Sequence, residues 1–62
     1  MMELIGKMVE VGTPEMIYLG KLVEVNDEEV YLESEAGWIV VPVNHVAYIR
    51  EASEETPFLP EQ

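Results

Sequence analysis

The chain has 62 residues, of which 48% are hydrophobic, and its 13 acidic and 3 basic side chains give a formal net charge of −10. The hydrophobic fraction is normal for a folded domain and excludes a wholly disordered chain, whereas the negative charge opposes contact with phosphate backbones and anionic membranes. The sequence has no cysteine and one histidine, which excludes disulfide bonds, thiolate metal sites and a multi-histidine zinc site within one copy.

A single domain of this length is marginally stable alone, because it buries only about 60% of the surface that its unfolded chain exposes. Small domains gain stability from disulfides, a bound metal or oligomerisation. Since the first two are excluded here, we expect this chain to be stabilised by oligomerisation. No apolar run approaches the ~20 residues of a membrane-spanning helix, and no signal-peptide pattern opens the sequence. We expect a cytoplasmic protein without membrane or DNA partners.

The first half of the chain predicts two strands joined by a turn. Val9 and Val11 lie two apart with Glu10 between them, a short strand pattern, and the Gly-Thr-Pro-Glu sequence of residues 12–15 favours a turn. Residues 16–25 are rich in strand-forming side chains, and the run is long for a flat strand in a small sheet. Gly20 near its middle marks a bulge, a sharp bend or a close backbone approach. We therefore expect a strongly bent second strand, with one helical turn at most in residues 1–5.

The second half predicts three further strands. After the polar turn at residues 26–29, residues 30–34 alternate, so that Val30 and Leu32 face one way and Tyr31 and Glu33 the other. Residues 38–43 read Trp-Ile-Val-Val-Pro-Val and are apolar on both faces. An antiparallel strand with one face in water normally alternates, so another molecule must cover the second face of this one. Residues 46–50 form the last predicted strand.

Five short strands with tight turns predict an all-β fold, a small five-stranded antiparallel barrel of the SH3-like type over residues 1–50. Residues 51–62 contain four glutamates, two prolines and no basic residue, and we interpret them as an acidic C-terminal tail. In the last two strands we expect Ile39, Val41, Val46 and Ile49 to fill the interior.

The remaining apolar residues of these two strands predict an oligomer interface. Proline lacks a backbone N–H, so Pro42 belongs at a sheet edge or a bulge, and an exposed edge is a template for pairing with another chain. Tryptophan is enriched where subunits meet. We expect the interface between copies to include Trp38, Val40, Pro42, Ala47 and Tyr48.

Two sets of residues carry a resemblance to a known family. The first is Gly6, Lys7, Val9, Val11, Tyr18, Gly20, Leu22 and Val25; the second is Val41-Pro42-Val43-Asn44 followed by Val46, Tyr48 and Ile49. Over residues 4–50 this pattern resembles the Sm-like (LSm) family, whose SH3-like barrels assemble into rings and usually bind RNA. The resemblance implies a homo-oligomeric ring of about five to seven copies.

In RNA-binding members of that family, an aspartate and an asparagine after the bent strand and an arginine in the second motif hold the base. Here Pro42 stands at the place of the arginine, and Asn44 remains. The candidate RNA-binding residues are Asn26, Asp27, Tyr31, Asn44, Lys21 and Arg50. Because the motif is reduced and the chain is acidic, our first hypothesis is a non-enzymatic homo-oligomeric scaffold or protein-interaction module. The alternative is an RNA-binding ring of the riboregulator or RNA-chaperone type.

The sequence offers no catalytic constellation. His45 has no nucleophile beside it in the sequence, and the acidic residues 27–29 lack the spacing of a calcium loop. We expect no enzyme activity, no cofactor and no metal site within one copy. A third, distant hypothesis is a metal or small-molecule site that uses His45 or residues 27–29.

Overall fold

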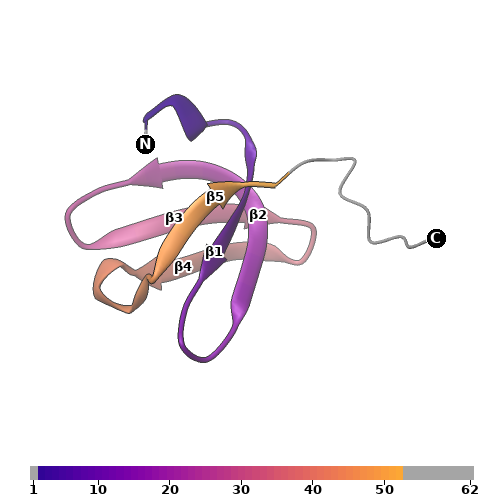
Figure 1. The fold of residues 1–62 in the computed structure, drawn as a ribbon. Helices are drawn as coiled ribbons and strands as arrows, with labels where there is room; N and C mark the ends of the chain where they lie inside the picture. The colour runs from indigo at the N-terminus through magenta and orange to yellow at the C-terminus, as the bar shows by residue number, and fades with distance from the viewer. Residues whose placement is uncertain (1, 53–62) are drawn as a thin grey trace.

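The computed structural model describes residues 2–52 and shows five strands with two short 3-10 helices (Figure 1). The elements in chain order are η1 (Met2–Leu4), β1 (Met8–Gly12), β2 (Ile17–Val25), β3 (Glu29–Ser34), β4 (Gly37–Pro42), η2 (Val43–His45) and β5 (Tyr48–Glu51). The all-β prediction is confirmed. Glu51, which the sequence placed in the tail, is the last residue of β5, and the rest of the predicted tail from residue 53 lies outside the described residues.

The strands form one antiparallel sheet in the order β4-β3-β2-β1-β5. Within residues 2–52, β4 pairs only with β3 and β5 pairs only with β1, so the sheet has two open edges. The sequence predicted a closed or nearly closed barrel, and the sheet of the described residues is not closed. The reason is directional: in a five-stranded antiparallel sheet the first and last strands run the same way, so they cannot close the sheet with one more antiparallel ladder.

Strand β2 serves both halves of the sheet. Its first part pairs with β1, from Ile17 opposite Gly12 to Lys21 opposite Met8, and its second part pairs with β3. The register shifts between Leu22 and Glu24, whereas Gly20 itself stays in register. A Cβ at Gly20 would lie 3.1 Å from the carbonyl oxygen of Glu33. Gly20 therefore allows a close backbone approach, and the bulge lies a few residues further on.

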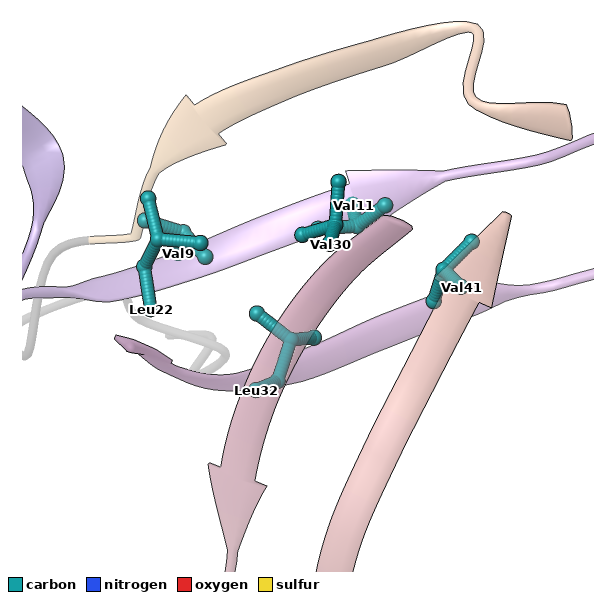
Figure 2. Packing of buried hydrophobic residues seen from close by; sticks show 6 residues of the cluster. All are labelled: Val9, Val11, Leu22, Val30, Leu32 and Val41. Atoms are coloured by element: carbon teal, nitrogen blue, oxygen red, sulfur yellow. The ribbon is translucent and has the colours of Figure 1, made fainter. Parts of the chain in front are cut away.

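Six apolar side chains form the core, each 3% exposed or less: Val9, Val11, Leu22, Val30, Leu32 and Val41. Figure 2 shows these side chains, from four strands, gathered in the interior of the curled sheet. Among the residues with described side chains, no polar or charged one is buried. Ile39, Val46 and Ile49 pack against this core, which confirms their predicted inward orientation and that of Val41.

Two leucines on β2 test this division between interior and exterior. Leu22 is fully buried, whereas Leu19 is 54% exposed on the opposite face of the same strand. We expect Leu22→Ala to lower the free energy of unfolding by about 2–5 kcal/mol, because it leaves a cavity in the core. Leu19→Ala should change it by less than about 0.5 kcal/mol. Urea denaturation at one protein concentration measures both; equal losses in the two variants would contradict the placement of the core.

Candidate functional site

The open edge of β4 carries exposed apolar side chains. Trp38 is 63% exposed and Val40 is 47% exposed. The alternate residues Ile39 and Val41 face the interior. The strand is therefore apolar on both faces, and its outer face meets solvent within the single chain. This is the arrangement that the sequence predicted for a surface covered by another molecule.

The backbone groups of β4 follow the same alternation as its side chains. The N–H of Val43 donates to the carbonyl of Glu28 at 2.8 Å. Bonded pairs alternate along an antiparallel ladder, so Val41 and Ile39 also bond to β3. It follows that Trp38, Val40 and Pro42 direct their backbone groups to the open edge. Pro42 has no N–H to offer there, so it removes nothing from the ladder with β3, as the sequence predicted.

The other open edge is β5. There a residue that points its backbone groups to the edge has a side chain that faces the core, whereas on β4 such residues have side chains that face solvent. The N–H of Ala52 donates to the carbonyl of Met8 at 2.9 Å, and Arg50 lies opposite Glu10 in the same ladder. By the same alternation, Arg50 bonds to β1, whereas Ile49 and Glu51 direct their backbone groups to the open edge. Ile49 is also a residue that packs against the core.

A side-chain cluster fastens β5 onto the outer face of β1. The Tyr48 hydroxyl donates to Glu10 Oε2 at 2.7 Å, and Arg50 Nη2 donates to the same oxygen at 3.2 Å. The Arg50 guanidinium also lies 5.6 Å from the centre of the Tyr48 ring, a cation–π contact. The Tyr48 ring covers Gly12, where a Cβ would overlap it. A larger residue at this position would displace the Tyr48 ring from its place over β1.

The cluster shifts two pKa values. The hydrogen bond from Tyr48 is the main cause that lowers the pKa of Glu10, and the charge of Arg50 lowers it further. The same hydrogen bond raises the pKa of Tyr48, because ionised Tyr48 would lose its proton to donate and would face the carboxylate. The cluster is thus most favourable when Glu10 is charged and Tyr48 is neutral.

The structure brings some of the candidate RNA-binding residues together and separates others. The bond between Val43 and Glu28 places η2, which contains Asn44, beside the turn that contains Asp27. The amide of Asn26 is already engaged within this turn, since its Oδ1 accepts from the backbone N–H groups of Glu28 and Glu29.

The other three candidates lie on the outer face of the sheet. Lys21 Nζ is 3.9 Å from Glu33, and Arg50 is bound to Glu10. Tyr31, predicted to be the exposed aromatic, is half-buried, and its hydroxyl donates to Glu29 at 2.6 Å. Lys21 and Arg50 thus lie beside carboxylates of the sheet. Tyr31 lies nearest the turn, because its partner Glu29 also donates its backbone N–H to Asn26. Trp38 is the more exposed aromatic side chain.

Within the described part of the chain, no three acidic or histidine side chains are arranged to hold a metal ion. No helix in residues 2–52 is long and apolar enough to span a membrane. Comparison with known protein families, curated proteins and solved structures finds no match. The geometry of the chain itself therefore carries the functional argument.

Sequence reasoning missed Glu10 and the exposed pair Ile17 and Leu19. Glu10 contacts Tyr48 across 38 positions of sequence, so no local pattern indicates the contact. Ile17 and Leu19 do carry a signal, because they alternate with Tyr18 and Gly20 on a strand whose inward positions are already apolar. An apolar outer face on a strand with an apolar inner face is the same pattern that identified Trp38 and Val40.

Tyr48→Phe tests the cluster by removing the hydrogen bond that most lowers the pKa of Glu10. We expect this pKa to rise toward its ordinary value and the variant to be less stable at neutral pH. A carboxylate with a lowered folded pKa stabilises above its unfolded pKa, about 4.3, and loses this contribution as the pH falls through the folded value. The stability difference from the wild type should therefore shrink in acid.

On the alkaline side the sign is reversed, because the folded pKa of Tyr48 is raised. Its contribution is complete below the unfolded value of about 10 and is lost as the pH rises through the folded value. NMR titration of the Glu10 carboxyl and urea denaturation across pH measure these effects. Tyr31→Phe, which removes the bond to Glu29, is the control. A Glu10 pKa that stays unchanged in Tyr48→Phe would rule out the cluster.

Proposed function

We propose that the protein is a non-enzymatic scaffold or protein-interaction module of the Sm-like type, built from copies that join the β4 edge of one to the β5 edge of the next. The observation that carries the proposal is the β4 edge, where Trp38 and Val40 combine exposed apolar side chains with edge-facing backbone groups. An open sheet edge is a template for another strand, and the described part of one copy offers two open edges, β4 and β5.

The alternation on the two edges makes them complementary. In an antiparallel pair, residues that exchange hydrogen bonds lie directly opposite and place their side chains on the same side. Edge-facing Trp38 and Val40 of one copy would thus lie beside edge-facing Ile49 of the next. Because Ile49 packs against its own core, the contact extends that core with apolar side chains. The predicted interface residues Pro42, Ala47 and Tyr48 flank this contact.

Contacts between two different edges are heterologous, so successive copies form a closed ring when the rotation fits. The resemblance to Sm-like proteins favours a ring of about five to seven copies. The charge of −10 on each copy opposes such assembly, and salt screens this repulsion. We therefore propose a ring that is more stable at physiological ionic strength than in dilute buffer.

A pair of valine-to-lysine variants tests the assembly. Val40 lies on the β4 edge, whereas Val23, 37% exposed, lies on the central strand β2. Lysine on an edge strand blocks pairing, so we expect Val40→Lys to sediment as a monomer. The wild type and Val23→Lys, which adds the same charge, should sediment as the same oligomer. Sedimentation equilibrium at micromolar concentration measures the mass, and a monomeric wild type would refute the proposal.

RNA binding is the second candidate, favoured by the proximity of η2, with Asn44, to the turn with Asp27. Fluorescence anisotropy with short U-rich and A-rich RNAs at low salt tests it. If RNA is a ligand, Asn44→Ala weakens binding several-fold and Asn26→Ala, whose amide supports the turn, alters folding as well. Wild-type protein that leaves both RNAs unbound at tens of micromolar eliminates this candidate.

A further inference from the structure

A second set of exposed apolar side chains lies on β1, β2 and β5. We call it the outer patch; its residues are Met8 (45% exposed), Ile17 (56%), Leu19 (54%) and Tyr48 (39%). The alternate residues of β1 are buried in the core, so the outer patch lies on the face opposite the core. Pairing across the strands sets this face in three rows, which are Ala52–Met8–Lys21, Arg50–Glu10–Leu19 and Tyr48–Gly12–Ile17.

Ile17 and Leu19 lie on the part of β2 that has a strand on one side only. Both pair with β1, whereas the ladder with β3 begins at Lys21. The proposed contact between copies would add a strand beside β5, which is two strands away from β2. That contact would therefore leave these two side chains in solvent.

The described part of the chain ends beside the outer patch. The N–H of Ala52 donates to the carbonyl of Met8 at 2.9 Å, so the last described residue stands in the first row. From the spacing of strands and of alternate residues, the Cα of Ala52 is about 12 Å from that of Leu19 and about 16 Å from that of Ile17. Six further residues of extended chain span up to about 20 Å. The chain can therefore reach both side chains by Phe58.

The sequence at that distance supplies apolar groups. Residues 53–62 read Ser-Glu-Glu-Thr-Pro-Phe-Leu-Pro-Glu-Gln, and Phe58 and Leu59 are the large apolar side chains among them. The prolines on both sides of this pair have a fixed φ. A segment with fewer accessible backbone conformations loses less freedom when it binds.

Charge complementarity also favours this segment. The three rows hold two basic side chains, Lys21 and Arg50, and one acidic side chain, Glu10, in a chain with a net charge of −10. The side chains of Lys21 and Arg50 are 53% and 68% exposed, so each can approach a second carboxylate. Residues 53–62 contain three glutamates and no basic residue. This face therefore attracts an acidic segment, while the same charges disfavour a basic partner.

We propose that residues 53–62 bind across the outer face of their own copy. The Phe58-Leu59 pair then packs on the exposed apolar side chains of β2, and the two glutamates that precede the pair lie near the two basic side chains. This contact uses neither open edge, so it does not depend on the proposed assembly. It removes the outer patch from water and leaves the β4 and β5 edges as the surfaces through which copies meet.

A spin label on the full chain tests the contact. Because the chain has no cysteine, Glu61→Cys carries a single nitroxide close to the apolar pair. NMR spectra of the isotope-labelled protein then show which amides the nitroxide broadens. We expect strong broadening at residues 17–19. Amides near Ala52 broaden in any case, because the label is tethered there, so residues 17–19 provide the readout.

Serine variants of the spin-labelled protein separate docking from the tether. Phe58→Ser with Leu59→Ser keeps the length and charge of the segment and removes its apolar pair. We expect this variant to lower the ratio of docked to undocked protein about tenfold or more, which restores the signals of residues 17–19. The matched control is Val23→Ser, which changes an exposed apolar residue of β2 outside the outer patch and should leave the broadening unchanged.

The charge contribution has its own variant. Glu54→Gln with Glu55→Gln removes the two carboxylates that precede the apolar pair, so we expect the docked fraction to fall, though by less than in the double serine variant. Added salt should lower the docked fraction of the wild-type sequence in the same way, because it screens exposed charges.

Three outcomes would overturn the proposal. Broadening at residues 17–19 that persists in the Phe58→Ser, Leu59→Ser variant would mean a tethered segment without a binding site. Strongest broadening on β4 would place the segment at a sheet edge. In a mixture of spin-labelled protein without isotope and isotope-labelled protein without spin label, broadening at residues 17–19 would assign the segment to a neighbouring copy.

The contact and the edge assembly can fail separately. Val40→Lys, which is expected to be monomeric, should keep the broadening at residues 17–19. A monomeric wild type that shows this broadening would support the docked segment and refute only the edge assembly, whereas an oligomer without it would do the reverse.

Discussion

In β4, the residues that turn their side chains to solvent are also the residues that turn their backbone groups away from β3. Val41 and Ile39 bond to β3 through their backbones and turn their side chains inward. Trp38 and Val40 are left with exposed apolar side chains and with amides that face the open edge. A polar side chain would make such an edge compatible with water. Apolar side chains instead add the hydrophobic effect to the hydrogen bonds that a new strand would form. The proposed assembly depends on this coincidence.

The short strand β5 gives the complementary edge its shape. It has four residues and pairs only with β1 among the described strands. The contacts of Tyr48 and Arg50 with Glu10 hold it from the outer side, while Ile49 packs on the core from the inner side. An edge held on both sides loses little further freedom when another strand binds.

The strand alternation could be predicted from the sequence, because Val30 and Leu32 on one face and Trp38 and Val40 on the other follow a period of two. Closure could not, because it depends on the direction of β5 relative to β4. Gly20 was expected to mark a bulge, a sharp bend or a close backbone approach; the structure shows the close approach at Gly20 and a register shift between Leu22 and Glu24. The contact of Glu10 with Tyr48 joins residues far apart in sequence. Glu51 was placed in the tail, since neither its charge nor its neighbours mark the end of a strand.

Hydrogen exchange of individual amides tests the edge pairing most directly. In a single copy, the N–H groups of Trp38 and Val40 have no strand partner among the described residues, whereas those of Ile39 and Val41 bond to β3. If copies pair through these edges, the amides of Trp38 and Val40 are protected in concentrated protein and lose this protection on dilution, while those of Ile39 and Val41 stay protected throughout. Amides of Trp38 and Val40 that exchange as fast as those of an unfolded peptide at every concentration would contradict it.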